Sequence, residues 1–145
     1  MSPRFHAAFA AVASVVVVTA VGWGFVLVGS PGTRRLERFD EQRLRDLQTI
    51  AHEIQLMVVN PHKKGTLKEA LPKTLEEAAQ RARNERVNPR DPETGEPYGY
   101  TVKNETAFEL CATFSQQRDW DSRVFWNHPA GTHCFTINVF DPPPF

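Results

Sequence analysis

"DPETGEPYGYTVKNETAFELCATF", residues 91–114, is the part of the sequence that decides the fold. Prolines and a glycine crowd its first seven positions, which excludes a helix and predicts successive turns. Two segments with alternating apolar residues follow, and the tetrapeptide 103–106 between them has the composition of a tight turn. We therefore expect an antiparallel hairpin with one apolar face. The residues expected on that face are Tyr98, Tyr100, Val102, Phe108, Leu110, Ala112 and Phe114.

A third strand is predicted at 133–140, "HCFTINVF", where Phe135, Ile137 and Val139 alternate with polar residues. Cys111 and Cys134 then fall on matching, outward faces of two strands, which makes them a plausible disulfide pair. Such a bond contributes about 3 kcal/mol and places the domain in an oxidising compartment. The alternative is two ordinary thiols in a reducing compartment.

A long amphipathic helix is predicted at 33–59, because apolar residues from Leu36 to Met57 recur mostly every three or four positions. Asn60-Pro61 ends it. We expect its apolar stripe to cover the sheet, which gives an α+β fold with about three antiparallel strands; a partner-binding helix is the alternative. Its solvent face is expected to carry Arg38, Glu41, Arg45, Asp46 and Glu53.

A short helix is predicted at 75–84. "TLEE", residues 74–77, matches a capping box in which Thr74 is the N-cap and Glu77 reaches back to the amide of Thr74.

The N-terminal run Ala7–Gly29 holds no charged residue. As a helix it extends for about 34 Å, enough to cross a hydrocarbon core. A cleaved signal peptide is the rival hypothesis, but its apolar region is normally shorter. Trp23 and Phe25 suit the aromatic belt at a membrane interface. "SPG", residues 30–32, is expected to break the helix after the anchor.

The orientation of this anchor is contested. Arg4 precedes it, whereas Arg34, Arg35 and Arg38 follow it, and that excess favours a cytoplasmic C-terminal domain. A long domain is translocated largely regardless of charge, and a disulfide requires the exterior. We therefore expect a bacterial inner-membrane protein with a cytoplasmic tip, anchor and break at 1–32, a periplasmic α+β domain at 33–140 and a proline-rich tail at 141–145.

Composition and motifs favour a protein that is not an enzyme. The 17 basic and 17 acidic residues cancel, which removes the electrostatic argument for a nucleic-acid partner. The sequence lacks a P-loop, a dinucleotide motif and a nucleophile elbow, so we expect neither a cofactor nor a small-molecule substrate. Asp91, Glu93 and Glu96 resemble a calcium site, but the turn requires Asp91 and Gly95 by itself.

His128, His133 and Cys134 are soft ligands that leave a metal- or haem-binding hypothesis open. Their spacing fits no standard signature, and adjacent residues of a strand point to opposite faces. We therefore expect structural loop histidines and no metal site.

The order of these parts, with "LPKTLEEA" (71–78) and "DPETGEPYGY" (91–100), resembles type IV pilin-like proteins, especially the pseudopilins of type II secretion. The resemblance implies a helix packed on a small antiparallel sheet, and a structural role. The prepilin peptidase site of those families is not matched by "MSPRFHAAF", residues 1–9. The resemblance therefore implies a pilin-like domain on an ordinary membrane anchor.

The leading functional hypothesis is an accessory or structural subunit of a larger membrane complex, for example photosynthetic or respiratory. A pseudopilin-like component of a secretion or pilus system and a periplasmic metal- or haem-binding protein are the alternatives. The expected partners are membrane lipid and other subunits, because residues of small size four apart let helices approach closely. The candidate contact residues are Ala7, Ala11, Ser14, Ala20, Trp23 and Gly24 in the anchor and Pro142, Pro143, Pro144 and Phe145 in the tail.

Overall fold

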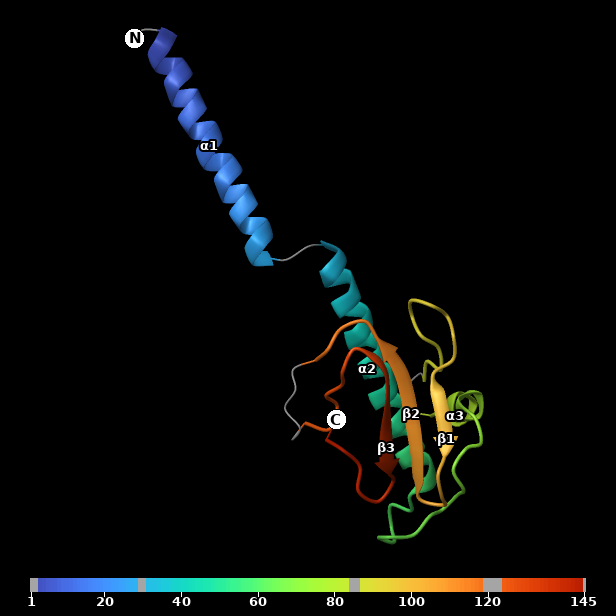
Figure 1. Cartoon of the computed structure of the whole chain (residues 1–145). Coiled ribbons are helices and arrows are strands. Elements are labelled where there is room, and N and C mark those ends of the chain that lie inside the picture. The colour runs from blue at the N-terminus through green and yellow to red at the C-terminus, as the bar shows by residue number, and fades with distance from the viewer. Residues whose placement is uncertain (1–2, 29–30, 84–86, 119–123, 145) are drawn as a thin grey trace. The chain divides into compact units, whose positions relative to one another are not determined.

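The computed structural model describes residues 3–28, 31–83, 87–118 and 124–144 (Figure 1). The chain divides into two compact units, Met1–Arg35 and Leu36–Phe145, and each is described by itself. The first unit is built on one apolar helix, and the second holds a three-stranded antiparallel sheet with helices packed around it. The α+β fold that the sequence predicts is therefore confirmed.

The helix of the first unit, α1, spans Pro3–Val28. Its segment His6–Val26 is 21 residues long and apolar enough to cross a membrane. At a rise of about 1.5 Å per residue this segment extends for about 31 Å, close to the thickness of a hydrocarbon core. Large apolar side chains such as Val18, Trp23 and Phe25 are exposed on several sides of the helix, as a lipid-facing span requires.

The second helix, α2, spans Pro31–Val58 and so begins two residues before the predicted start. Pro31 is its first residue, where the missing N–H costs no hydrogen bond and the fixed φ suits a helix. Pro31 and Gly32 therefore belong to the first turn of α2, and the apolar helix α1 and the amphipathic helix α2 are two separate helices. Ser30, the rest of the predicted break, lies outside the described residues.

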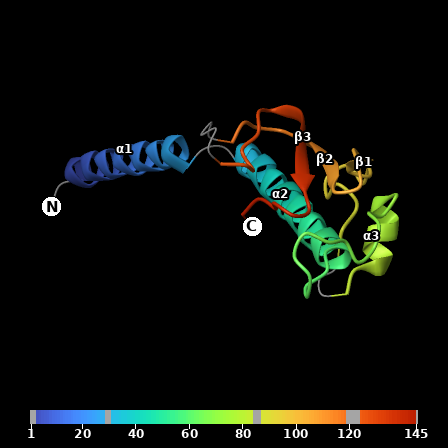
Figure 2. The ribbon, with the colours of Figure 1, turned by 90° about the horizontal axis from the view of Figure 1, so that it is seen from below.

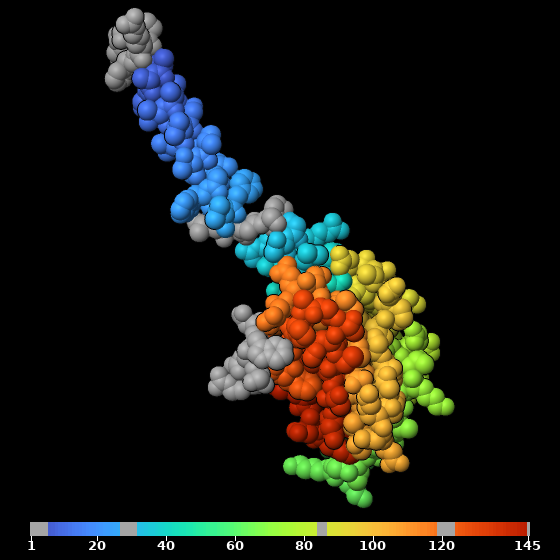
Figure 3. All heavy atoms as spheres, in the orientation of Figure 1, coloured from blue at the N-terminus to red at the C-terminus, as the bar shows by residue number. Residues whose placement is uncertain are grey.

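The sheet consists of β1 (Gly99–Val102), β2 (Ala107–Phe114) and β3 (Gly131–Asn138) in the order β1-β2-β3. α2 lies along one face of it, and the view from below shows α3 (Leu75–Arg81) on the same side of the sheet as α2 (Figure 2). The opposite face is open, and Figure 3 shows β2 and β3 at the surface there. The core between α2 and the sheet is centred on Leu47, Ile50, Ile54, Phe108, Leu110, Phe135 and Ile137.

The predicted strand faces are confirmed for β2 and β3. Phe108, Leu110 and Ile137 are fully buried, and the alternating residues between them face outward. β1 is shorter and covers less of the core: Val102 lies opposite Phe108, on the predicted face, but keeps 42% of its surface exposed. β3 begins two residues before the predicted start because Gly131 pairs with Phe114.

The capping box of α3 is confirmed in part. Thr74 accepts a hydrogen bond from the Glu77 amide at 3.2 Å, as predicted. The Glu77 carboxylate, however, accepts from the amide of Lys73 at 2.7 Å and not from that of Thr74. α3 ends at Arg81, three residues before the predicted end, because Ala82 has the extended ψ of 135°.

The loop after β2 is closed on itself, and the C-terminal tail is attached to it. The amide of Arg118 donates to the carbonyl of His128 at 3.0 Å, which joins the two ends of the loop. Trp126 is buried, and its indole N–H donates to the carbonyl of Pro144 at 2.9 Å. Pro143 is buried as well, so part of the tail packs within its own domain.

Candidate functional site

Arg43, which α2 carries into the core, is the most heavily bonded side chain of the second unit. Only 3% of it is exposed. Its Nε donates to Asp91 at 2.6 Å, and Nη2 donates to Asp91 at 3.1 Å and to Glu93 at 2.6 Å. Its Nη1 donates to Asp40 at 2.8 Å and to Ser115 at 3.2 Å. These five bonds equal the five N–H donors of a guanidinium, so the group is fully satisfied. We call Arg43, Asp40, Asp91, Glu93 and Ser115 the Arg43 clamp.

Asp91 joins the clamp to the turn that opens the sheet. Its carboxylate accepts from the amides of Glu93 at 2.8 Å and Thr94 at 3.0 Å, which is the geometry of an Asx turn. Gly95 has φ +74°, the left-handed conformation that glycine adopts without strain. Burial raises the pKa of Asp91, but the bonds from Arg43 and the two amides outweigh it and leave the pKa below its usual value. The predicted turn is confirmed.

Asp40 joins the clamp to the end of β2. Its two carboxylate oxygens accept from the amides of Ser115 at 2.9 Å and Gln116 at 2.8 Å. Because Asp40 and Arg43 lie three residues apart on α2, the helix holds both the turn before β1 and the loop after β2. The clamp therefore fixes both segments to the same helix.

Two residues assigned to the solvent face of α2 take part in internal contacts. Asp46 is half-buried and accepts from the hydroxyl of Tyr98 at 3.0 Å and the amide of Asn88 at 3.0 Å. Burial raises the pKa of Asp46. The pKa of the Tyr98 hydroxyl is raised by burial and by the neighbouring carboxylate of Asp46. Glu53 is 2% exposed, and one of its oxygens accepts from the amide of Arg83 at 3.3 Å. The prediction that both lie on the solvent face is therefore wrong.

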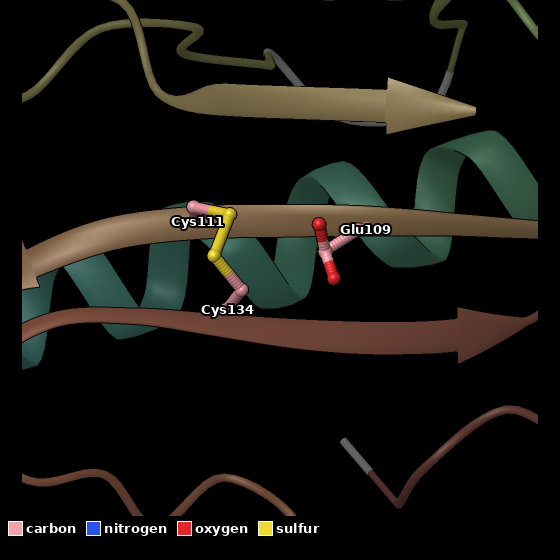
Figure 4. Close-up of side chains that lie close together, drawn as sticks. All are labelled: Glu109, Cys111 and Cys134. Atoms are coloured by element: carbon pink, nitrogen blue, oxygen red, sulfur yellow. A yellow bond between two sulfur atoms is a disulfide. The ribbon is translucent and has the colours of Figure 1, made fainter. Parts of the chain in front are cut away.

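Cys111 and Cys134 form a disulfide, as predicted. They are directly paired in β2 and β3 and lie on the outer face of the sheet (Figure 4). Gly99 makes room for them, because a Cβ at position 99 would lie 2.9 Å from the Cβ of Cys111. Glu109 lies near both sulfurs, but its carboxylate pairs with Lys103 at 2.9 Å. Because the sulfurs are bonded to each other, neither offers the thiolate that a metal requires.

The two histidines of the metal hypothesis both pack against aromatic rings. His128 is 2% exposed and stacks on Phe114 with 3.5 Å between ring centroids. Its Nδ1 lies 3.2 Å from the carbonyl oxygen of Pro129. His133 lies edge-on to Phe135 at 4.8 Å. Burial lowers the pKa of His128, which favours the neutral imidazole.

A groove of about 430 Å³ opens where β2 extends past the start of β1, and we call it the β2-edge groove. One side is formed by β2 and its continuation to Ser115, and the other by the turn residues 91–97. Figure 1 shows that turn (yellow) beside the arrowhead of β2. Arg43, Tyr98 and Gly99 also line the groove. The groove therefore lies directly over the Arg43 clamp.

The anchor residues proposed as contacts are all surface residues of α1. Ala7, Ala11, Ser14 and Ala20 are exposed, and Gly24 is half-exposed. A Cβ at Gly24 would meet no atom within 4 Å, so the small residue is not required by packing within the chain. Of the tail residues, Pro142 is half-buried and Pro144 exposed, and Phe145 lies outside the described residues.

The Arg43 clamp is what the sequence reasoning missed. A signal was present, because Arg43 lies four residues after Phe39 and four before Leu47. That spacing puts it on the apolar stripe of the helix, where a charge must be paired. Two of its partners, Asp91 and Ser115, lie 48 and 72 residues away, and no local pattern identifies them.

Comparison with protein-family models finds no match, and comparisons with curated proteins and with solved structures find none either.

Proposed function

We propose that this chain is a non-enzymatic, single-pass membrane protein whose α+β domain lies outside the cytoplasm and serves as an accessory subunit of a larger membrane assembly. The observation that carries the proposal is that the side chains most suited to chemistry are held in internal contacts. In the described part of the second unit, the buried guanidinium of Arg43 is saturated by five hydrogen bonds, both cysteines are joined, and His128 is stacked in the core. These groups stabilise the fold, which favours a binding or scaffolding role.

The disulfide supports the placement outside the cytoplasm. Disulfides persist in oxidising compartments and are rare in the cytosol. Since α1 can span a membrane once, the domain that follows would be on the oxidising side. Alkylation of the thiols in intact membranes without reductant tests this. We expect Cys111 and Cys134 to stay unmodified until a reductant is added, and modification of both without it would contradict the placement.

Native purification from the source membrane tests the accessory function. The full chain with a C-terminal affinity tag is extracted in mild detergent, and co-purifying proteins are identified by mass spectrometry. A matched chain in which an unrelated membrane-spanning helix replaces residues 1–28 is the control. We expect a defined set of membrane subunits with the native anchor and a reduced set with the foreign one. Recovery of the chain alone in both cases would refute the proposal.

A pseudopilin-like component is the second candidate, favoured by the packing of α2 along a three-stranded antiparallel sheet. Intact-mass measurement separates the two. A pseudopilin loses N-terminal residues to its peptidase and gains a methyl group on the new amine. The accessory subunit keeps Met1 or begins at Ser2 without methylation.

A further inference from the structure

The β2-edge groove contains a backbone donor and acceptor that are left without a strand. β1 pairs with β2 from Gly99 opposite Cys111 to Val102 opposite Phe108, whereas β2 continues to Phe114. Beyond Cys111, β2 is paired only with β3 and becomes an edge strand on the side of the groove. Unpaired strand edges are templates for the addition of another extended segment.

The alternation of backbone hydrogen bonds along β2 shows which residue directs its N–H and C=O into the groove. The amide of Val139 donates to Thr106 at 2.9 Å, so even-numbered residues of β2 direct their backbone groups toward β3. The amide of Lys103 donates to Ala107 at 2.9 Å, so odd-numbered residues direct theirs toward β1. By this alternation the N–H and C=O of Thr113 point into the groove. Neither has a backbone partner within the described residues.

The available edge is short because its neighbours are occupied. On one side Cys111 is paired with Gly99, and on the other the amide of Ser115 already donates to Asp40. Thr113 therefore offers one pair of hydrogen bonds, enough for an extended segment of a few residues. Its side chain remains on the outer face, where its hydroxyl lies 3.0 Å from that of Thr132.

The charge of the groove defines the chemistry of the partner. Three carboxylates, those of Asp91, Glu93 and Glu96, line it together with one guanidinium, that of Arg43. The guanidinium is saturated, so the excess of negative charge is directed to solvent. Glu96 is exposed at the rim, and 34% of the Glu93 side chain is exposed. A segment with a lysine or arginine complements this rim.

We propose that the β2-edge groove binds a short, extended, basic segment of a partner subunit, which pairs with the backbone of Thr113 and places a cationic side chain beside Glu96. This inference rests on the proposed accessory function, because it names where a partner would attach. Two backbone hydrogen bonds and one rim ion pair predict a Kd of about 10 mM for an isolated peptide. Avidity from the shared membrane would raise the effective affinity.

Titration of the full, isotope-labelled chain in detergent micelles tests the groove directly. The probes are the acetylated and amidated pentapeptides KTVTK and ETVTE. We expect KTVTK to shift the Thr113 amide signal and slow its exchange, and ETVTE to do neither. Absence of a shift with both peptides, or equal shifts with both, would overturn the proposal.

Matched variants separate a groove effect from a folding effect. Thr113→Pro removes the N–H that faces the groove, and Thr136→Pro removes an edge-facing N–H on β3 as the control. We expect KTVTK to bind at least tenfold more weakly to Thr113→Pro and unchanged to Thr136→Pro. Glu96→Lys changes an exposed rim residue, and we expect about fivefold weaker KTVTK binding at low salt. Unchanged binding to Glu96→Lys would contradict the charge argument.

The same variants distinguish this inference from the proposed function. If subunits co-purify equally with Thr113→Pro and Thr136→Pro, the groove is not the attachment point and the accessory function stands. If wild type co-purifies with nothing, the accessory function fails, whereas the peptide titration still decides the groove. A change in the oligomeric state of the purified chain on Thr113→Pro would identify a second copy as the occupant and overturn the partner proposal.

Discussion

Replacing Arg43 by methionine tests the Arg43 clamp. The change removes four hydrogen bonds to carboxylates and one to Ser115, at a side chain that is 3% exposed. Removing one partner of a buried ion pair costs about 3–5 kcal/mol. Asp40 and Asp91 each keep two backbone amides, and Glu93 can turn into solvent. The free energy of unfolding should therefore fall by about 3 kcal/mol, near the low end of that range.

Arg45→Met is the matched control, two residues further along the same helix. Arg45 is 64% exposed and lies 3.7 Å from Glu41, so its loss should cost less than about 1 kcal/mol. Urea unfolding of the full chain in micelles, followed by tryptophan fluorescence with the disulfide intact, gives both values. Arg43→Lys should recover only part of the lost stability, because an ammonium lacks the planar, bidentate donors with which a guanidinium binds two carboxylates at once. Equal stabilities for the two methionine variants would refute the reasoning.

Three further predictions use the same unfolding assay. Replacing Cys111 and Cys134 by alanine should cost about 3 kcal/mol, and reduction of wild type should reproduce that loss; a variant as stable as oxidised wild type would contradict it. Gly99→Ala should cost about 1–3 kcal/mol because its Cβ meets that of Cys111 at 2.9 Å, and a neutral effect would show that the strands can separate at no cost. The pKa of His128 is lowered by burial, so the unfolded chain binds its proton first as the pH falls below about 6.5. Stability should therefore fall between pH 7.5 and 5.5 by up to about 1.4 kcal/mol per unit, and His128→Phe should remove this slope; an identical slope in the variant would exclude His128 as its cause.

The fold could be predicted from the sequence where local rules suffice. The alternation of apolar and polar residues along the strands placed Phe108, Leu110 and Ile137 on one face of the sheet. The same alternation placed Cys111 and Cys134 on the other face. The apolar helix α1 was predictable because a run of this length without a charged residue is typical of a helix that can span a membrane. The predicted helix ends were less accurate than the strand faces. A proline can stand in the first turn of a helix or just after its last turn, and Pro31 stands at the start of α2.

The clamp could not be predicted, because its geometry depends on residues far apart in the chain. Arg43 and Asp91 are 48 residues apart, and Asp40 and Ser115 are 75 apart. Simple amphipathic counting assigned Glu53 and Asp46 to the solvent face, since it treats every charge as exposed. Contacts with residues that the helix pattern does not contain draw both inward: the Arg83 amide for Glu53, and the Tyr98 hydroxyl and the Asn88 amide for Asp46. The groove at Thr113 required the register of three strands and could not come from composition.

The same long separations determine the order in which the chain can fold during synthesis. α2 is complete after residue 58, but Asp40 receives its last amide only when Gln116 has been made. Until then the apolar stripe of α2 has no sheet to cover it. The β1–β2 hairpin has short-range contacts and can form first. We expect docking of α2 onto it to be the late, slow step, with the apolar stripe of the nascent helix open to aggregation while the remaining residues emerge.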